Sequence, residues 1–424
     1  MKEISKSQTK HKIDLTLDRV FKALEMLDNP QYKLPPVIHV AGTNGKGSTI
    51  AFLRAIFEAA NYKCHVYTSP HLIKFNERIV ISGNEITDDY LASLIEEVSI
   101  KCKSLNLTFF ETTTLVGFLA FARNKADVLL LETGMGGQFD ATNIIEKPAL
   151  TIITPISYDH QEFLGDTIEK IAYEKACIMK KATKCIISKQ TDAAKKVLFD
   201  YAKKIGADVI EFESLSSLQG AYNEAIHSND LDSKPDGLLR FARNDDYIKD
   251  TKFKLSLNGS HQYINAACAV TAIKNLPKFS ITKENIGKGL SSAKWPARLQ
   301  KIADNTYLDG AHNLDGARIV ADFIKGQRGG KKVVVILGML KNKDIYALLN
   351  ELKPQTDLLM AVNIAGENCF TAEEIVEIAD KLSIKAIPSN NAVKTLESAR
   401  KTYPDSLIII CGSLYLAGEF LPRD

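Results

Sequence analysis

Short apolar runs alternate with longer amphipathic segments along most of the chain. The apolar runs predict strands at residues 37–41, 63–67, 127–131, 149–154, 184–188 and 208–211. Helices are predicted between them at residues 46–60, 88–103, 111–125, 167–181 and 191–205. Strands that alternate with helices are typical of βαβ units around a parallel sheet. The strands are apolar at nearly every position, as expected when both faces of the sheet are covered.

A second series of the same kind begins near residue 299. Its strands are expected at residues 304–308, 332–338, 356–362 and 406–411, and its helices at 313–326, 343–352, 371–382 and 391–401. The two series predict an α/β protein in which a P-loop-type, mostly parallel sheet domain at residues 1–292 precedes a smaller Rossmann-like domain at 299–424. Residues 222–250 are polar and rich in turn formers, and we interpret them as a surface insertion without a catalytic part.

The composition narrows the class of protein. The 424 residues carry a net charge of only +3, which gives no reason to expect nucleic-acid or membrane partners. The seven cysteines form no Cys-x-x-Cys pair, and the N-terminus is polar and lacks a signal peptide. No apolar run is long enough to span a bilayer. These features predict a cytoplasmic protein with reduced thiols.

The strongest single motif follows the first predicted strand. The stretch that binds phosphate in this interpretation is Gly42, Thr43, Asn44, Gly45, Lys46, Gly47, Ser48 and Thr49. A glycine-rich turn between a strand and a helix directs backbone N–H groups at an anion, with Lys46 on the terminal phosphates and a hydroxyl on Mg²⁺. The common pattern has its hydroxyl directly after the lysine, whereas here Gly47 intervenes. The alternative is a tight turn that binds nothing.

Two further polar residues stand at predicted strand exits, where parallel sheets bind ligands. Glu132 follows the run 127–131 and is suited to a phosphate-bound cation, although a solvated loop carboxylate is the plain alternative. His160 follows the run 149–154. Imidazole is a poor magnesium ligand, so the chemistry alone leaves His160 open between a ligand and a hydrogen-bonding residue.

Several longer motifs resemble those of folylpolyglutamate synthases. They are Gly-Thr-Asn-Gly-Lys-Gly-Ser at 42–48, Ser-Pro-His-Leu at 69–72, Asn-Glu-Arg-Ile at 76–79, Asp-Ala-Thr-Asn at 140–143, Asp-His at 159–160, Glu-Lys-Ala at 174–176, Asp-Gly-Ala-His-Asn at 309–313 and Cys-Gly-Ser at 411–413. Bacterial members of this family are often bifunctional dihydrofolate synthase/folylpolyglutamate synthases and belong with the Mur ligases. The resemblance extends from about residue 15 to the end, apart from the insertion.

The resemblance implies roles for residues that the pattern alone leaves unassigned. Ser48, Glu132, His160 and Lys175 would match the magnesium positions, with two Mg²⁺ sites and a carbamylated Lys175. Asn265, Arg298 and Asp309 would contact ATP, while His312 and Ser413 would contact glutamate across a cleft between the domains. Arg78, Thr108, Phe110, Asp140 and Ala141 would line the pteroate pocket. The plain alternatives are a solvated Lys175, a capping Asn265 and a core Phe110.

The implied reaction is ATP-dependent amide formation. ATP would phosphorylate the carboxylate of dihydropteroate or of a tetrahydrofolate, and the amine of L-glutamate would displace phosphate. Lys46 and Lys175 would take part in catalysis, and His312 is a candidate base. Small molecules would be the partners, with no nucleic acid or membrane, and a monomer is expected.

Other readings remain open at this point. They are a Mur-type or cyanophycin-type ligase, a nucleotide-dependent switch without ligase chemistry, and an inactive family member. Gln138 stands where the family usually has a cation, which motivates the inactive reading. Cys177 and Ala297 replace glycines of the family motifs, and their small size predicts little effect.

Overall fold

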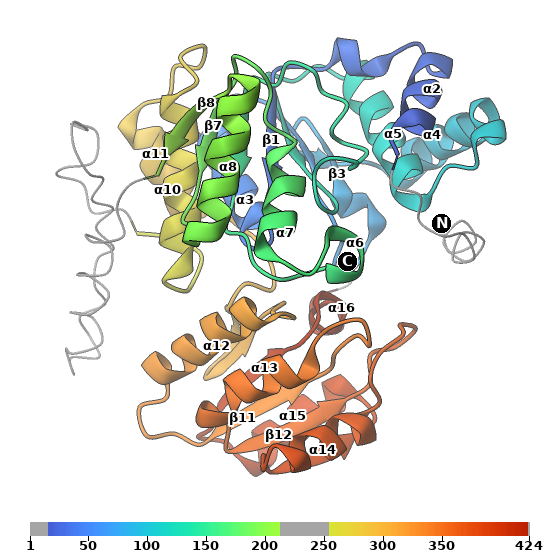
Figure 1. The fold of residues 1–424 in the computed structure, drawn as a ribbon. Coiled ribbons are helices and arrows are strands. Elements are labelled where there is room, and N and C mark those ends of the chain that lie inside the picture. Colours follow the sequence, from blue (N-terminus) through green and yellow to red (C-terminus); the bar gives the residue numbers. More distant parts are fainter. Residues whose placement is uncertain (1–15, 213–253, 423–424) are drawn as a thin grey trace. The chain divides into compact units, whose positions relative to one another are not determined.

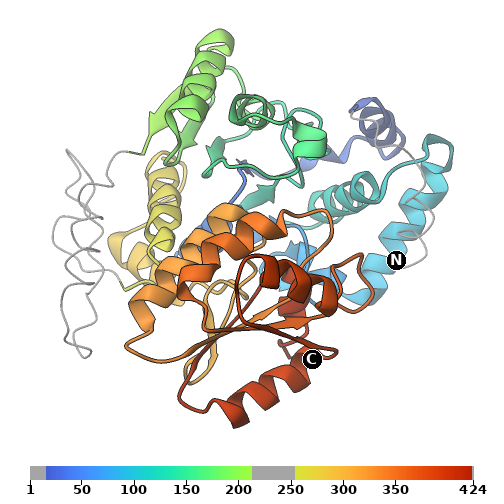
Figure 2. The ribbon, with the colours of Figure 1, turned by 60° about the horizontal axis from the view of Figure 1, so that its bottom comes forward.

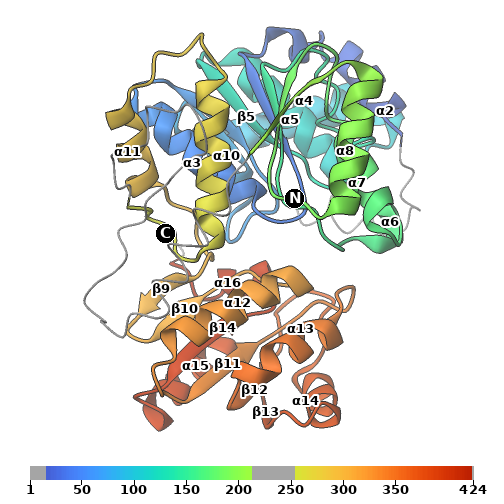
Figure 3. The same ribbon diagram turned by 60° about the vertical axis from the view of Figure 1, so that its left-hand side comes forward.

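A computed structural model describes residues 16–212 and 254–422, so the predicted insertion at 222–250 lies outside the described residues. The chain divides into two compact units, which are described separately. The first unit contains described residues 16–212, 254–256 and 263–293, and the second contains 257–262 and 294–422. The ribbon can be followed from three sides in Figures 1, 2 and 3.

The first unit is built on a sheet that has eight strands among the described residues, in the order β4-β3-β2-β5-β1-β6-β7-β8. These strands are β1 (Val37–Ala41), β2 (Cys64–Tyr67), β3 (Ile79–Ile81), β4 (Asn84–Glu85), β5 (Val128–Glu132), β6 (Leu150–Ile153), β7 (Lys184–Ile187) and β8 (Asp208–Glu211). The sheet is parallel from β2 to β8, while β3 and β4 add an antiparallel edge. Strand β1 lies at the centre between β5 and β6, so the exits of these three strands meet at one place.

Helices cover both faces of this sheet, as Figure 3 shows for α3, α10 and α11 on one side and α7 and α8 on the other. The helices are α2 (Asp18–Met26), α3 (Lys46–Ala59), α4 (Asp88–Lys101), α5 (Phe109–Arg123), α6 (Gln161–Leu164), α7 (Ile168–Ala176), α8 (Asp192–Ile205), α10 (His261–Lys274) and α11 (Lys283–Ser292). Helix α3 packs closely on α11, α4 on α5, and α7 on α8. None of the helices in the described part of the chain combines the length and apolar character needed to cross a membrane.

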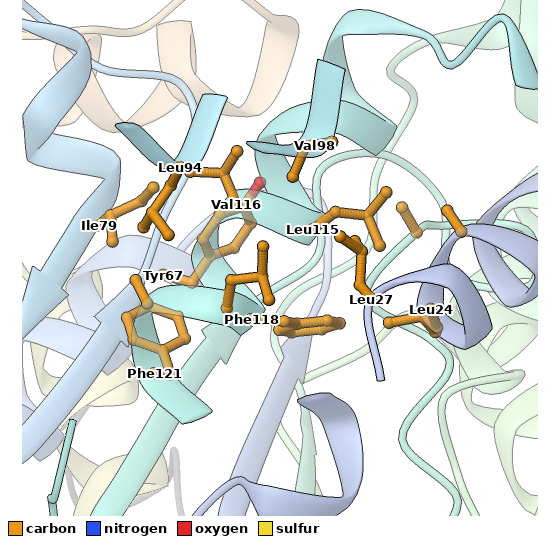
Figure 4. Close-up of a cluster of buried hydrophobic side chains, with 14 of the residues drawn as sticks. Leu24, Leu27, Tyr67, Ile79, Leu94, Val98, Leu115, Val116, Phe118 and Phe121 are labelled. Carbon is orange, nitrogen blue, oxygen red and sulfur yellow. The ribbon is translucent and has the colours of Figure 1, made fainter. Parts of the chain in front are cut away.

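A large apolar cluster fixes the position of α5 in the first unit (Figure 4). Phe118 and Phe121 of α5 are fully buried there and pack with Tyr67 of β2 and Leu94 of α4. Burial of side chains this large stabilises the fold by roughly 1.5–3 kcal/mol each. Helix α5 begins with a capping box in which Thr108 accepts from the Glu111 N–H, so its N-terminus is fixed as well.

The second unit has a six-stranded sheet among its described residues, in the order β13-β12-β11-β14-β10-β9. The strands are β9 (Gln300–Ala303), β10 (Thr306–Leu308), β11 (Val333–Leu337), β12 (Leu358–Val362), β13 (Ala386–Ser389) and β14 (Leu407–Cys411), and only β9 is antiparallel to its neighbour. The helices are α12 (Leu314–Gln327), α13 (Ile345–Leu352), α14 (Ala372–Lys381), α15 (Ala392–Thr402) and α16 (Leu414–Gly418). Alternate residues of β11 pack against α12, α13 and α14 in one apolar cluster.

The predicted fold class is confirmed, because both sheets are mostly parallel and both are covered by helices. The predicted strands all occur close to their expected bounds. The expected helix at 167–181 is wrong at its C-terminal end, because α7 stops at Ala176 and the chain reaches a left-handed residue at Ala182. Lys175 therefore lies in the last turn of a short helix.

A buried histidine makes the stability of the first unit depend on pH. Burial, and then the nearby Lys180 charge, lower the pKa of His39 to about 3. Below about pH 6.5 His39 is therefore protonated in the unfolded chain but stays neutral in the folded protein. We expect the free energy of unfolding to fall by about 1.4 kcal/mol per pH unit on this account as the pH drops from 6.5 towards 3.

Urea unfolding at pH 7.5 and pH 5.5 measures this effect. The His39→Gln variant should show a shallower decline between the two pH values than the wild-type protein. Equal declines in the two proteins would show that His39 does not resist protonation.

Candidate active site

The candidate site is built on the turn that joins β1 to α3. Gly42 has a φ of +150° and Gly45 a φ of +87°, so the backbone at both positions suits glycine. Any Cβ on Gly42 would collide with the Thr154 side chain, and one on Gly45 would collide with the amide of Asn265. The turn is therefore held against the end of β6 on one side and against α10 on the other.

Hydrogen bonds to the chain after β6 hold the same turn in place. The N–H groups of Thr43 and Asn44 donate to the carbonyl of Pro155, at 3.0 and 3.2 Å. The Thr43 hydroxyl exchanges hydrogen bonds with the backbone of Ser157, and the Asn44 amide donates to the Ser157 hydroxyl. Thr43 and Asn44 thus shape the turn, while Gly47, Ser48 and Thr49 form the first turn of α3.

Lys46 and Glu132 lie together beside the turn. The Lys46 Nζ donates to the carbonyls of Gly42 and Thr43, at 3.2 and 3.3 Å, and lies 3.9 Å from the Glu132 carboxylate. Glu132 is the last residue of β5 and is 4% exposed, and its other oxygen accepts from the Ser69 N–H. Glu132 is therefore a buried, paired carboxylate and not a solvated loop residue.

Lys175 reaches the same turn from α7. Its side chain is buried, and its Nζ donates to the Gly42 carbonyl at 2.9 Å. Burial, and secondly the Lys46 ammonium, lower the pKa of Lys175 to about 7. The plain alternative of a solvated lysine is wrong, because the Lys175 side chain is buried and bonded to the Gly42 carbonyl. An amine with a pKa near 7 is partly neutral at neutral pH and can act as a nucleophile.

His160 stands at the mouth of this arrangement. It has a left-handed backbone at the start of α6, and its Nε2 is 3.7 Å from the Asp159 carboxylate. No group of three or more histidine, cysteine, aspartate or glutamate side chains in the described ranges is arranged to hold a metal ion. The expected set of Ser48, Glu132, His160 and Lys175 differs in kind, because it contains a hydroxyl and an amine.

A pocket shows which of these residues come together. Its wall is formed by the turn after β1, the loop after β5 and the segment around α6 and α7. The lining residues are Gly42, Thr43, Lys46, Thr133, Gly134, Met135, Gly136, Asp159, His160, Leu164 and Lys175. Lys46, His160 and Lys175 therefore face one space, with Glu132 directly behind Lys46.

The loop after β5 is organised by Asp140. One carboxylate oxygen accepts from the Met135 N–H at 2.8 Å, and the other accepts from the N–H and hydroxyl of Thr142. Ala141 beside it is buried. Asp140 thus binds its own loop, and its contact with a pterin remains a prediction.

Phe110 lies against this loop, and Arg78 lies against Phe109, the residue that precedes Phe110. The Phe110 ring is in the place that a Cβ on Gly134 would occupy, and it is only partly buried. Arg78 donates to His71 Nδ1 at 2.8 Å and stacks over the rings of Phe75 and Phe109. Thr108 caps α5 directly before these aromatic residues.

In the second unit, Asp309, His312 and Ser413 lie at the exits of the neighbouring strands β10 and β14, and Arg298 lies just before β9. Asp309 follows β10, and its carboxylate accepts from the N–H groups of Leu299 and Ala311. The ring Nδ1 of His312 bonds the Gly310 carbonyl at 2.8 Å, and Ser413 caps α16 after β14. A Cβ on Gly310 would meet Arg298 Nη1, so the Arg298 side chain lies against this loop.

Ala297 adopts a left-handed backbone with a φ of +55°. The glycine that the family pattern has here would adopt this conformation freely, whereas alanine carries a strain of about 1 kcal/mol. Cys177 instead has ordinary helical dihedrals, so its replacement of glycine carries no such strain.

Several residues that shape the first site had no role assigned from the sequence. Ser157 and Thr154 contact the turn after β1, Asp159 precedes His160, and His39 lies in β1 three residues before Gly42. Residues 154–160 follow a strand exit, and this position was the signal for the first three. A single histidine inside an apolar strand was the signal for His39.

The loop after β5 also packs tightly on α7 at Gly137. A Cβ on Gly137 would collide with the backbone carbonyl of Glu174 and come within 3.1 Å of the Lys175 Cα. We expect Gly137→Ala to lower the free energy of unfolding by about 1–3 kcal/mol, because backbone atoms must move apart.

Gly326 in α12 is the matched control, because a Cβ there meets nothing within 4 Å. Gly326→Ala should raise the free energy of unfolding by about 0.5–1 kcal/mol. Thermal unfolding of both variants makes the comparison, and a Gly137→Ala protein as stable as wild type would contradict the close packing.

Comparison with known proteins assigns both units. A family model described as the Mur ligase middle domain matches residues 40–273, and one described as the dihydrofolate synthetase C-terminal domain matches residues 296–423. The Bacillus subtilis dihydrofolate synthase/folylpolyglutamate synthase is 32% identical over 422 residues, covering 96% of this chain and 94% of the relative.

Solved structures agree over nearly the whole chain. The structure of Escherichia coli FolC in complex with DHPP and ADP has a TM-score of 0.84 at 26% identity, covering 98% of this chain and 95% of that one. A bifunctional folylpolyglutamate synthase/dihydrofolate synthase with Mn, AMPPNP and L-glutamate bound has a TM-score of 0.81 at 26% identity, with coverages of 97% and 95%. This chain therefore belongs to the Mur ligase family, among the dihydrofolate synthases/folylpolyglutamate synthases.

Proposed function

We propose that the protein is an ATP-dependent ligase that adds L-glutamate to dihydropteroate and to the γ-carboxylate of tetrahydrofolates through an acyl phosphate. The observation that carries this proposal is the convergence of Lys46, Lys175 and Glu132 on the turn after β1. Relatives bound to DHPP, ADP, AMPPNP and L-glutamate support the same substrates. We further propose that the enzyme works as a monomer on small molecules.

The turn at residues 42–49 would hold the ATP phosphates. Its N–H groups stand at the N-terminus of α3, where the helix dipole favours an anion. The Asn265 amide lies against Gly45 from α10, and in this proposal it would contact the nucleotide beside the turn. Lys46 would exchange its carbonyl partners for phosphate oxygens and neutralise charge as the phosphoryl group moves.

Magnesium fits the donors that are present. The Ser48 hydroxyl and the Glu132 carboxylate are buried oxygen donors at adjoining strand exits, and oxygen donors are what Mg²⁺ prefers. When bound at Ser48 and Glu132, Mg²⁺ would supply positive charge that stabilises the phosphoryl group during its transfer. His160 is a weaker match, because a nitrogen donor suits softer metals.

A second magnesium site requires a change at Lys175. A neutral amine attacks CO₂ at carbon, loses one proton and becomes a carbamate, which replaces a cation by an anion. The pKa of Lys175, lowered to about 7 by burial and by Lys46, makes the neutral amine available. The carbamate would face the pocket beside His160 and supply the oxygen donors that the site otherwise lacks.

The remaining roles concern the acceptor substrates. The loop 133–142 and the Phe110 ring would form the pterin side, with Arg78 on a substrate carboxylate. In the second unit, Arg298 and Asp309 would bind ATP, while Ser413 would bind glutamate. His312 is a candidate base for the glutamate amine, because the bond from its Nδ1 to the Gly310 carbonyl fixes its ring.

Phosphate release from ATP tests the proposal directly. With Mg²⁺ and L-glutamate present, release should depend on added dihydropteroate, and separately on added tetrahydrofolate. Lys46→Ala should reduce turnover at least 100-fold, because one charge-neutralising donor is worth that much in such sites. Lys196→Ala is the control, since Lys196 forms an exposed pair with Asp200 far along the chain on α8.

The outcomes separate the alternatives. Release with tetrahydrofolate alone would reject the bifunctional assignment, and pterin-independent release would favour a switch or another ligase. No release from folded protein would favour the inactive member that Gln138 suggests.

Carbamylation of Lys175 has its own test. Protein equilibrated with ¹³C-bicarbonate should give a carbamate carbon signal that is absent from Lys175→Ala. In CO₂-depleted buffer, turnover should fall and bicarbonate should restore it, more readily above pH 7 because the amine is then neutral. Lys180→Ala is the matched control, since Lys180 is a second partly buried lysine with a lowered pKa, and it should keep the signal. An unchanged signal in Lys175→Ala would exclude this lysine.

A further inference from the structure

His39 is a buried histidine that the reaction described above does not use. It lies in the middle of β1, three residues before Gly42, and is 0% exposed. Its Nε2 is 2.8 Å from the Thr142 hydroxyl, while its Nδ1 has no hydrogen-bond partner among the described residues. Burial of a polar ring with one hydrogen-bond partner lowers the free energy of unfolding, so the bond to Thr142 is important for holding His39 in the core.

The protons in this contact can be assigned from Thr142. Its hydroxyl donates to Asp140 Oδ1 at 2.5 Å, so its only proton is used there. The hydroxyl must then accept from His39, which places a proton on Nε2. Because the ring is fully buried, it stays neutral and its Nδ1 carries no proton. Hydrogen bonds therefore run in one direction, from the His39 ring through Thr142 to the Asp140 carboxylate.

The Asp140 carboxylate connects these hydrogen bonds to residues 133–136, which form one wall of the pocket. Its other oxygen accepts from the Met135 N–H at 2.8 Å, and Met135 lines the pocket between Gly134 and Gly136. Gly134 abuts the Phe110 ring on the proposed pterin side. The wall thus separates the space of Lys46 and Lys175 from the aromatic ring against which the acceptor would lie.

We propose that His39 is a positioning residue, which holds the 133–136 wall through Thr142 and Asp140 so that acceptor and phosphate meet in register. This inference rests on the proposed function for its kinetic readout. His39 touches no substrate in this account and acts only through the hydroxyl of Thr142. Loss of a hydrogen bond that ends on a carboxylate typically changes an equilibrium or rate roughly tenfold or more.

The experiment compares His39→Phe, Thr142→Val and the double variant. Each single change should lower kcat/KM for dihydropteroate roughly tenfold, while the KM for ATP stays within twofold. The double variant should be no worse than either single variant, because both changes break one relay. His39→Gln and Thr142→Ser keep a donor at each place and should recover most of the loss.

His65→Gln is the matched control on strand β2, which β5 separates from β1. His65 is also fully buried, but its ring bonds only backbone groups, at Asn124 and Ser82. Its kinetics should match those of the wild-type enzyme. Nitrogen NMR of the wild-type protein should show His39 protonated on Nε2 and uncharged between pH 6 and 8.

Three results would overturn the relay. They are additive losses in the double variant, equal losses in His65→Gln, and a His39 proton found on Nδ1. If His39→Phe does not fold, the relay is still tested by comparing Thr142→Val with Thr142→Ser. The NMR assignment of the His39 proton tests it independently. A wild-type enzyme without pterin-dependent turnover would reject the proposed function instead, and the proton position would then test the relay alone.

Discussion

Two lysine side chains converge on a single backbone carbonyl, that of Gly42. Lys46 reaches it from the start of α3 at 3.2 Å, and Lys175 reaches it from the last turn of α7 at 2.9 Å. Burial disfavours the charged form of Lys175, and the nearby Lys46 ammonium adds repulsion, so the pKa of Lys175 is lowered to about 7. The shared carbonyl joins β1, α3 and α7 at one point.

The sequence was a good guide wherever the fold depends on continuous apolar runs. Strands such as β5 and β11 are buried at every position, so their pattern is unmistakable. Strand β13 was missed because Ala386–Ser389 is largely exposed and contains a proline, as an edge strand can. Helices α10 and α11 were not predicted. In α11 a glycine, Gly289, and not a large apolar side chain lies against the α3 backbone at Ile56, which lets the two helices pack closely.

The site was predictable to the extent that it sits at strand exits. Gly42 and His160 follow β1 and β6, Glu132 is the last residue of β5, and the sheet order places β1 between the other two strands. The burial of Lys175 was beyond the sequence, because one helical lysine looks the same whether it faces solvent or a carbonyl. The role of His39 was equally hidden, since its partner Thr142 is distant along the chain.

In the loop after β5, a family motif residue holds the backbone of its own loop. Asp140 accepts from Met135 and Thr142, so its charge is used to hold the loop in a fixed conformation. The Gln138 carbonyl accepts from Asn143, whose amide also reaches Cys177, so the backbone there is held whatever side chain position 138 carries. A glutamine at position 138 therefore lacks the positive charge that the family usually has there but leaves these backbone bonds in place. We expect this change to weaken an interaction with an anionic substrate and to leave the fold of the loop unchanged.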